Sequence, residues 1–530
     1  MTLAKSRADV VVIGGGLAGI TAAIELAEAG ADVTVLEARP WLGGATCSFA
    51  RRGLTIDNGQ HAFLRSSTAY RDLLARLGVT SFAVIQDRLD LTVLAPDGQA
   101  LLRRSGLPAP LHLARSLASF GLLTPAERIR AAVAAIMLRY SSPGRRGDAG
   151  ATLGSWLASR GQSENAVRLL WDLLSGSALG LPADEADLQL AATVLRSALL
   201  GRRDNADIGV PAIPFSQLHA GPAAELLTRL GVTVELGVTA EAVEAARGGG
   251  FDVRIDRASG TAASGGTASG TALSGTDASG TALSGTDASG TAASGTAASG
   301  TAASGPDVIH AAGVVLAIPA WEAAAIAPPE LAADADRWAR LRPSPVISLH
   351  VIYSARVTRL PYAAVAGSPL RWVIDKSGPA GLHSGQYLAA TVPAADRYAD
   401  LPAAQLRAEL LPELGRLFPA AAGTEVQDFF ITRERRARIR QEPEAQRLRM
   451  APACGLAGLA LAGAWTDASW PDTMEGAVRS GQAAAGELLA DLGAGDISVP
   501  AQGTGPDGRA LGPAARADGD GSPPDLAKAI

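Results

Sequence analysis

The sequence predicts an α/β fold that opens with a strand, a helix and a second parallel strand. Residues 8–13 (ADVVVI) form a continuous apolar run, rich in β-branched residues, that ends in glycines. An alanine-rich helical pattern from Leu17 to Ala29 follows, and a second strand-like run occupies Asp32 to Leu36. Because alternating strands and helices build parallel sheets, we expect a βαβ unit at the start of the chain.

Composition limits the classes of protein to which the chain can belong. The 530 residues are 47% hydrophobic and carry a formal net charge of -5. The length predicts two domains with disordered additions, and without a basic field we expect no nucleic-acid partner. The only two cysteines, Cys47 and Cys454, lie far apart in the sequence, so we expect neither a disulfide framework nor a metal site.

The N-terminal residues resemble a secretory signal only superficially. Lys5 and Arg7 precede an apolar run, but that run carries glycines of a nucleotide-binding pattern that cleavage would remove. No other stretch reaches the ~18 uninterrupted apolar residues of a membrane-spanning helix. We therefore expect a cytoplasmic protein that is soluble or peripheral at the inner face of the membrane.

The rest of the chain divides into helical, strand-like and low-complexity segments. Residues 107–200 are rich in Leu and Ala and predict a helical block, in which Thr124-Pro125-Ala126-Glu127 forms a capping box. Repeats of Ser-Gly-Thr-Ala predict a disordered insertion over residues 258–305, and residues 491–530 predict a disordered tail. Strand-like runs also occur at Val232 to Leu236, Phe251 to Ile255 and Val308 to Ile318.

A glycine motif directly follows the first strand. Gly14-Gly15-Gly16-Leu17-Ala18-Gly19 satisfies the pattern GxGxxG, in which glycines permit a tight turn and a close backbone approach to a pyrophosphate. The N-terminus of the next helix favours that anion. Glu37 ends the second strand, where its carboxylate can accept hydrogen bonds from an adenosine ribose. Together these features predict a Rossmann-type domain that binds NAD or FAD.

The residues after Glu37 favour FAD. Glu37-Ala38-Arg39-Pro40-Trp41-Leu42-Gly43-Gly44 resembles the extended FAD motif of the amine oxidase and phytoene desaturase superfamily. The resemblance implies cofactor contacts from Ala38, Arg39, Gly43 and Gly44. Many members have Arg after the glycine pair, whereas this chain has Ala45, so we expect one pyrophosphate or flavin contact to be missing.

A matching motif lies near the other end of the chain. Residues 459–467 (LALAGAWTD) indicate a strand ending in an acid, and residues 472–478 (DTMEGAV) open a helix whose N-terminus would favour the negative charge of a reduced flavin. Tight packing of a small-residue helix explains Gly476 and Gly481 equally well. The resemblance to the superfamily's closing flavin motif implies further cofactor contacts, and we expect them from Ala240, Gly463, Asp467, Met474, Glu475 and Ala477.

One pentapeptide narrows the resemblance. Asp57-Asn58-Gly59-Gln60-His61 resembles the DNGQH segment of the hydroxysqualene dehydroxylase family, in the same place after the second glycine pair. His61 is a candidate proton donor, because an imidazole with a near-neutral pKa can assist the loss of a hydroxyl as water. A structural hydrogen-bonding role for His61 stays open, and we expect Asp57 to fix a turn.

The resemblance implies a Rossmann-type FAD-binding domain interleaved with an α+β substrate domain, as in amine oxidases and desaturases. We assign the FAD-binding domain to residues 8–65, 206–257, 306–345 and 426–490. We assign the substrate domain to residues 66–205 and 346–425.

The same resemblance implies an FAD-dependent oxidoreductase that converts hydroxysqualene to squalene for hopanoid synthesis, with reduced FAD as the hydride donor. So apolar a substrate needs a deep apolar tunnel. The expected partners are this long-chain isoprenoid, enzymes of the squalene pathway and a membrane surface contacted peripherally. Leu111 to Leu123, which includes Arg115, is a candidate for that membrane contact, and core packing explains this stretch equally well.

Three alternatives stay open. A carotenoid or phytoene-type desaturase or isomerase would carry the same motifs but use the flavin oxidatively. A flavin amine oxidase would need aromatic residues beside the flavin and often a lysine; aromatics make up 4% of the chain, and Lys376 is its only lysine between the two ends. A non-catalytic lipid-binding protein of the same fold would have lost the cofactor, and the intact glycine motif argues against it.

Overall fold

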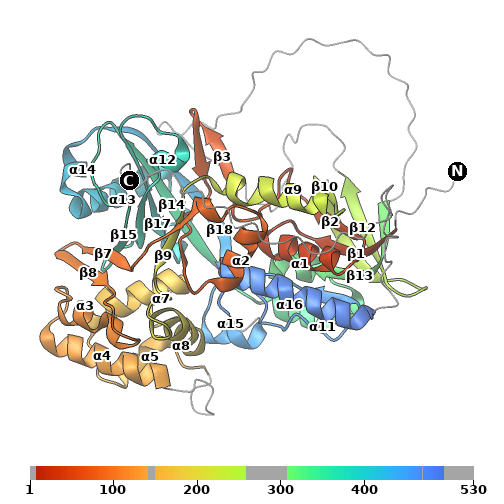
Figure 1. Cartoon of the computed structure of the whole chain (residues 1–530), viewed down its shortest axis with the longest axis horizontal. Coiled ribbons are helices and arrows are strands. Elements are labelled where there is room, and N and C mark those ends of the chain that lie inside the picture. The colour runs from red at the N-terminus through yellow and green to blue at the C-terminus, as the bar shows by residue number, and fades with distance from the viewer. Residues whose placement is uncertain (1–6, 141–149, 258–306, 468–469, 494–530) are drawn as a thin grey trace, which may run out of the picture.

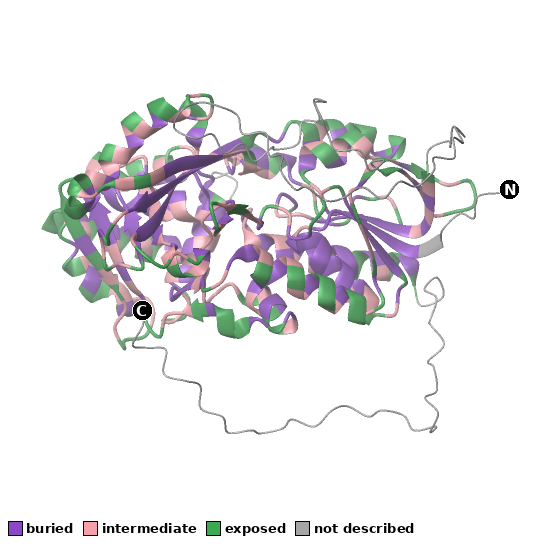
Figure 2. Ribbon diagram, turned by 90° about the horizontal axis from the view of Figure 1, so that it is seen from above, coloured by how far each residue is buried: buried purple, intermediate pink, exposed green. Residues whose placement is uncertain are grey.

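The computed structural model describes residues 7–140, 150–257, 307–467 and 470–493. These residues form two seven-stranded sheets, one toward each end of the molecule, with helices packed against both (Figure 1). Buried residues follow the strands of both sheets (Figure 2). The predicted insertion at 258–305 lies outside the described residues, as does the predicted tail from residue 494 onward.

The first sheet contains the predicted βαβ unit, since β1 pairs in parallel with β2 and α1 (Leu17–Glu28) connects them. Along β1, Val10 and Val12 face one core and Val11 and Ile13 face another, because side chains alternate along a strand. The strands in order are β10 (Thr233–Leu236), β2 (Val33–Glu37), β1 (Arg7–Ile13), β13 (Asp307–Leu316), β12 (Phe251–Arg257) and β11 (Val238–Ala245), with β19 (Leu459–Leu461) beside β13.

Helices cover both faces of this sheet. The core that contains Val10 is completed by α1, α2 (Thr68–Arg76), α9 (Gly221–Arg229) and α16 (Met474–Leu492). The core that contains Val11 is completed by α10 (Ala320–Ile326) and α11 (Ala332–Ala339). Helices α1 and α16 lie side by side although about 450 residues separate them in the sequence (Figure 1).

Two of the strands are joined through the insertion. β12 and β13 are antiparallel neighbours, and Ile255 lies opposite Asp307 in their register. The Nε atom of Arg257 lies 3.2 Å from Oδ2 of Asp307. The chain therefore leaves the sheet at residue 257 and returns to it beside the same point.

The second sheet belongs to the other half of the molecule. Helix α13 (Ala403–Leu417) and helix α14 (Pro419–Gly423) pack against this sheet and share its hydrophobic core. The strands in order are β18 (Val426–Ile439), β14 (Pro343–Tyr353), β17 (Gln386–Val392), β16 (Trp372–Asp375), β15 (Tyr362–Val365), β7 (Asp90–Ala95) and β8 (Gly98–Arg103).

The predicted helical block packs against β7 and β8. Its capping box is formed as predicted, because the Thr124 amide donates to Glu127 Oε2 over 2.8 Å and the helix starts at Pro125. The block contains α3 (Ala114–Ala118), α4 (Pro125–Tyr140), α5 (Leu153–Ala158), α6 (Glu164–Ala166), α7 (Asp172–Ala178) and α8 (Leu188–Val194), with π-helical turns at Val167–Trp171 and Leu195–Leu199.

Short elements join the two halves. They are the hairpin β3 (Ser48–Arg51) and β4 (Leu54–Asp57), the small sheet of β5 (Phe63–Leu64), β9 (Ile208–Pro211) and β6 (Ala83–Ile85), and the helices α12 (Ser377–Ala380) and α15 (Pro443–Leu448). Among the described helices, none combines the length and apolarity needed to cross a membrane.

The predicted domain bounds need four corrections. Residues 426–439 form β18, which pairs with β14 in the second sheet and not in the FAD-binding sheet, and β14 itself starts at Pro343. Helix α2 packs on the first core through Tyr70 and Leu73, although residues 66–205 were assigned to the substrate domain. Helix α16 continues to Leu492, past the predicted start of the tail. Local sequence patterns predict the helices and strands. Contacts between distant segments decide which of the two domains each helix or strand joins.

Candidate active site

Two glycine loops meet at the end of β1 without intervening side chains. The amide of Gly43 donates to the carbonyl of Gly15 over 2.8 Å. Gly44 has φ +57, and a Cβ there would lie 2.9 Å from the Cα of Gly16. A Cβ on Gly19 would lie 1.8 Å from the carbonyl oxygen of Gly14. The loops therefore need bare backbone, as the close approach of a pyrophosphate requires.

The N-terminus of α1 fits an anion. Its N-cap is Gly16, and no side chain of the described residues caps it. The amides of Leu17, Ala18 and Gly19 belong to the first turn, whose N–H groups have no partner inside the helix. Such a helix end attracts a phosphate group.

Glu37 and Arg39 hold the glycine loops in place. The carboxylate of Glu37 accepts from the Gly15 amide over 2.7 Å and from the Arg39 amide over 2.8 Å. The guanidinium of Arg39 donates to the carbonyl of Gly44 over 3.0 Å. Glu37 is buried, and each oxygen keeps acceptor capacity for a ribose hydroxyl. The residues present at this end of β2 therefore fit FAD.

Helix α16 has the close-packing role that its sequence left open, and its first turn lies at a cavity. A Cβ on Gly481 would lie 2.3 Å from the Ala18 carbonyl oxygen, so small residues do permit close packing of α16 on α1. At the other end, Thr473 Oγ1 accepts from the Gly476 amide and caps the helix. Met474 and Ala477 line a cavity, so the start of α16 faces the space between the two halves of the molecule.

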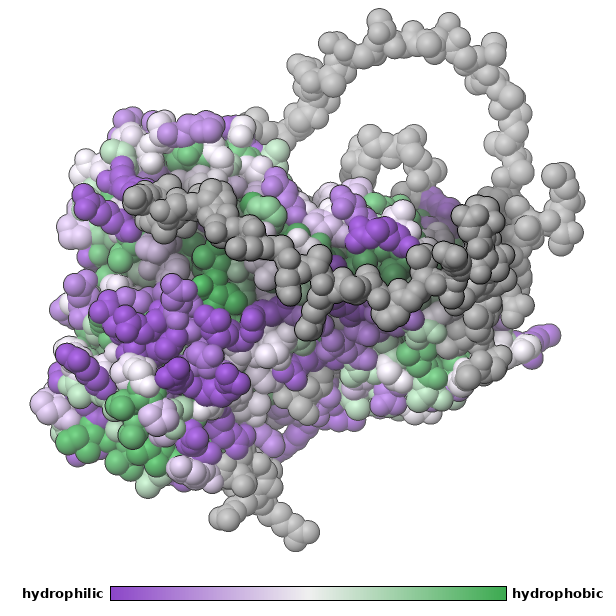
Figure 3. Space-filling view, viewed as in Figure 1, coloured by the Kyte–Doolittle hydropathy of each residue, from purple (hydrophilic) through white to green (hydrophobic). Residues whose placement is uncertain are grey.

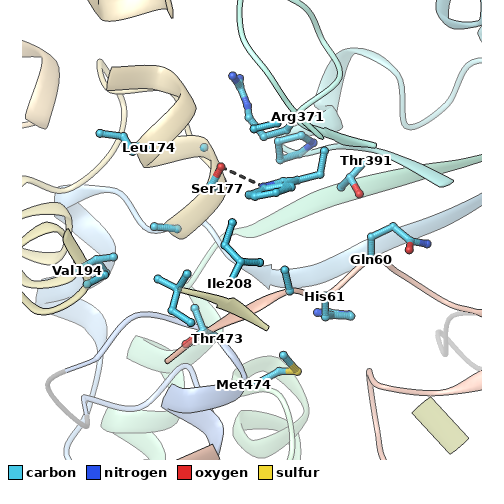
Figure 4. Close-up of a pocket in the computed structure, with 18 of the residues that line it drawn as sticks. Gln60, His61, Leu174, Ser177, Val194, Ile208, Arg371, Thr391, Thr473 and Met474 are labelled. Atoms are coloured by element: carbon cyan, nitrogen blue, oxygen red, sulfur yellow. Dashed lines mark hydrogen bonds between the residues drawn. The ribbon is translucent and has the colours of Figure 1, made fainter. Parts of the chain in front are cut away.

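This cavity has a volume of about 390 Å³ and is mainly apolar. On the side of the glycine loops it is lined by Leu17, Gly43, Thr46 and Met474. Leu174 and Val194 reach it from the helical block, across from Thr473 and Met474 (Figure 4). Further apolar lining comes from Leu89, Leu91, Leu102, Leu173, Leu195, Ala198, Leu199, Ile208, Trp372 and Ile374. The helical block thus supplies part of the apolar lining.

A few polar groups interrupt this apolar wall. The amide nitrogen and oxygen of Gln60, Oγ1 of Thr391 and Nε of Arg371 are buried without a hydrogen-bond partner among the described residues. All three residues line the cavity and are labelled in Figure 4. Since buried polar groups are almost always paired, these atoms indicate a place for the polar part of a ligand.

Two half-buried guanidinium groups add positive charge to the lining. Burial lowers the pKa of Arg371, and Asp172 offsets this only in part. Burial likewise lowers the pKa of Arg438, which Asp472 partly offsets. Both arginines and Asp472 line the cavity.

His61 lies in the cavity wall with its ring edge-on to Phe215, at a centroid distance of 5.2 Å. Burial, together with the charge of Arg438, lowers its pKa to about 4. The imidazole is therefore neutral at pH 7. The proton-donor prediction assumed a near-neutral pKa, and on that point it is wrong, because the prediction did not include desolvation.

Comparison with known proteins also indicates that the chain binds a flavin. The family model for flavin-containing amine oxidoreductases matches residues 17–265 and 291–489. The chain belongs to this family. It is thus an FAD-dependent oxidoreductase with an amine oxidase-like α/β fold, as the glycine loops predicted.

Relatives within and around the family differ in what they act on. The chain is 28% identical to a hydroxysqualene dehydroxylase of Rhodopseudomonas palustris, covering 91% of this chain and 98% of that protein. It is 27% identical to a hydroxysqualene dehydroxylase of Sinorhizobium fredii, covering 91% and 99%. A solved structure of putrescine oxidase bound to putrescine has a TM-score of 0.62 at 18% identity, covering 91% of this chain and 99% of that one, and shows the shared fold.

In this flavin-containing amine oxidoreductase, the other residues that we predicted to contact the cofactor lie in different structural environments. The Gly463 amide donates to Ser480 on α16. Ala240, on β11, packs against the core that includes Leu36. Asp467 is exposed and is not part of the cavity lining, whereas Asp472 is.

Glu475 directs its side chain away from the cavity. Its carboxylate accepts from the amides of Ala69 and Tyr70 at the start of α2 and from Arg479. Only the backbone of Glu475 is left for the predicted cofactor contact.

The DNGQH segment is anchored by an ion pair that the sequence did not reveal. Asp57 Oδ2 accepts from the ammonium of Lys376 over 2.7 Å, and its Oδ1 accepts from Ser48 Oγ and the Phe215 amide. Neither Asp57 nor Lys376 is part of the cavity lining. We expected Asp57 to fix a turn, whereas its carboxylate joins β4 to segments that are distant in the sequence.

Reasoning from sequence also missed Gln60, Arg371, Thr391 and Arg438 as lining residues. Gln60 lies inside the DNGQH segment, whose resemblance was the only available signal for it. The polar character of the lining depends on which strands become neighbours, and the sequence pattern does not state that.

Proposed function

We propose that this oxidoreductase catalyses the FAD-dependent reductive dehydroxylation of hydroxysqualene to squalene, as a step toward hopanoids. The observation that carries the proposal is a mainly apolar cavity with a few unpaired polar groups, next to the glycine loops that fit FAD. Hydroxysqualene is a long hydrocarbon with a single hydroxyl group. Like the cavity, it is mostly apolar and polar at one place. The two similar hydroxysqualene dehydroxylases support the choice of substrate.

When bound, FAD in its reduced form would supply a hydride and a proton, so that hydride takes the place of the hydroxyl and the hydroxyl leaves as water. The residues of the chain bind and orient the substrate. Leucines of the helical block hold the hydrocarbon and exclude water. The Gln60 amide and the Thr391 hydroxyl can hydrogen-bond the substrate oxygen, and the neutral imidazole of His61 can donate one N–H to it.

The cavity disfavours the amine oxidase alternative. Two guanidinium groups in the lining, Arg371 and Arg438, repel a protonated amine. Trp372 is the only Phe, Tyr or Trp among the lining residues that the structure describes, so an aromatic cage is not formed there. Lys376 is engaged with Asp57 outside the lining.

The desaturase alternative is disfavoured by the polar groups themselves. A carotenoid hydrocarbon would leave Gln60 and Thr391 without partners, at a cost of about 1–3 kcal/mol for each buried group. An alcohol provides both a donor and an acceptor for them.

The test is an anaerobic turnover experiment with purified protein. The protein is mixed with chemically reduced FAD and hydroxysqualene, and squalene is followed by mass spectrometry. We expect squalene to form, and we expect Gln60→Leu to lower kcat/KM while the flavin absorbance stays unchanged. Flavin-loaded protein that leaves hydroxysqualene intact but oxidises another polyprenoid would contradict the proposal and favour a desaturase.

A further inference from the structure

Helix α4 exposes an apolar stripe. The exposed fractions are 67% for Ile129, 46% for Val133, 47% for Ile136, 47% for Met137 and 74% for Tyr140. Their spacing of four, three, one and three residues places them on one side of the helix. A soluble helix normally presents polar side chains in this position.

The opposite side of α4 explains why the helix is nevertheless held in place. Ala131, Ala134 and Leu138 are buried in the core of the helical block. The helix is therefore apolar on both its inner and its outer side, and only the inner side is covered by described residues.

The exposed apolar surface continues into the segment before α3. Leu107 and Leu111 are 52% and 54% exposed, and α3 packs against α4. Apolar residues gather on the corner of the molecule formed by these helices (Figure 3). Exposed apolar patches of this kind mark interaction sites, because soluble proteins rarely keep them without a partner.

Charge indicates the partner. Residues 107–140 contain four arginines, Arg115, Arg128, Arg130 and Arg139, and a single acid, Glu127. Glu127 is buried and accepts from Ser163 and Thr124, so it adds no exposed negative charge to the patch. Arg115 and Arg130 are exposed beside the apolar side chains. An apolar face bordered by cations is complementary to an anionic phospholipid surface.

We propose that α4, with residues 107–111, docks this protein onto an anionic phospholipid membrane, with the stripe inserted at the headgroup level. The buried side of α4 shares its core with Leu89, Leu91 and Leu195, which line the cavity. One helical layer therefore separates the lipid-facing surface from the cavity. The docking surface does not depend on which reaction the cavity catalyses.

The surface differs from the one expected from sequence. Of the stretch Leu111 to Leu123, only Ala114–Ala118 is α-helix, and Phe120 and Leu123 are buried. This stretch contributes Leu111 and Arg115 to the patch, while α4 contributes most of its area.

The first test is co-sedimentation of the full chain with vesicles of phosphatidylcholine alone or mixed with phosphatidylglycerol. We expect binding to the mixed vesicles only. The variant Ile129→Ser/Val133→Ser/Met137→Ser should bind them at least about tenfold more weakly, because insertion affinity scales with buried apolar area. The control Val84→Ser/Leu236→Ser changes residues that are each 44% exposed elsewhere, and it should bind like the wild type.

A second variant separates docking from misfolding. Arg115→Glu/Arg130→Glu keeps the apolar stripe and should also lose binding to the mixed vesicles. Thermal unfolding and flavin absorbance of both variants should match the wild type.

Three results would overturn the proposal. The first is a wild-type protein that stays in the supernatant with the mixed vesicles, and the second is binding that the stripe variant retains. The third is a dimer in solution that the stripe variant dissociates, with no vesicle binding, which would make the patch a contact between two copies of the chain.

Discussion

The ammonium of Lys376 lies 2.7 Å from the carboxylate of Asp57, although the two residues are 319 positions apart. Their side chains are only 6% and 4% exposed. Lys376 follows β16 of the second sheet, and Asp57 ends β4 and begins the DNGQH segment. The pair therefore fixes that segment, which includes two cavity residues, to the second half of the molecule.

Breaking this pair should strongly destabilise the fold. We expect Lys376→Met to lower the free energy of unfolding by about 3–5 kcal/mol, because it leaves a buried charge without a partner. The double variant Asp57→Asn/Lys376→Met should lose less than the sum of the two single changes. Urea unfolding measures both. Arg435→Met, which removes an exposed partner of Asp400, is the control and should cost at most about 1 kcal/mol. Equal losses for Lys376→Met and Arg435→Met would refute a structural role for the pair.

The glycine loops predict a selective loss of flavin. Gly44→Ala places a Cβ 2.9 Å from the Cα of Gly16 at φ +57, so we expect the purified protein to lose most of its absorbance near 450 nm. Gly53→Ala has similar backbone strain, at φ +79, but no atom within 4 Å of the new Cβ. This control should keep its flavin. Flavin retention by Gly44→Ala would show that the loops tolerate a side chain.

Buried histidines predict instability in acid. Burial lowers the pKa of His61 to about 4 and those of His219 and His350 to about 3. In the unfolded chain a histidine has a pKa near ~6.5. Above pH 6.5 both states are neutral and the stability is fully present. As the pH falls from about 6.5 toward 3, the unfolded state binds protons first and the stability decreases.

Urea unfolding between pH 7 and pH 4.5 tests this linkage. We expect His350→Gln to flatten the decrease by up to about 1.4 kcal/mol per pH unit, the value for one proton. His383→Gln alters an exposed side chain and should leave the slope unchanged. Parallel curves for wild type and His350→Gln would mean that His350 is not buried as a neutral group.

Cavity volume should limit the substrate. Ala198 is 3% exposed and lines the cavity, so Ala198→Phe should raise KM for a long isoprenoid by about tenfold or more while the flavin stays bound. Ala404→Phe, on the exposed side of α13, serves as the matched control. An unchanged KM in Ala198→Phe would mean that the substrate binds elsewhere.

Local patterns were sufficient to predict elements and the cofactor loops, but not the assembly around them. The run at residues 8–13, the capping box at Thr124 and the start of α16 at Met474 depend on neighbours in the sequence, and the structure confirms all three. The pairing of Lys376 with Asp57, the membership of β18 in the second sheet and the lowered pKa of His61 depend on contacts between distant segments. The periodicity of a sequence does not encode contacts between distant segments, so only the structure reveals them.

The meeting of Arg257 and Asp307 has a practical consequence. Because the strands that carry them are hydrogen-bonded neighbours, the segment between them need not set their register. Two separate polypeptides, one ending at residue 257 and the other starting at residue 307, would meet along the same strand pair. The residues predicted to contact the flavin divide between Gly14 to Gly44 on the first polypeptide and α16 on the second, so the yellow colour of bound flavin would report their reassembly in a split-protein assay.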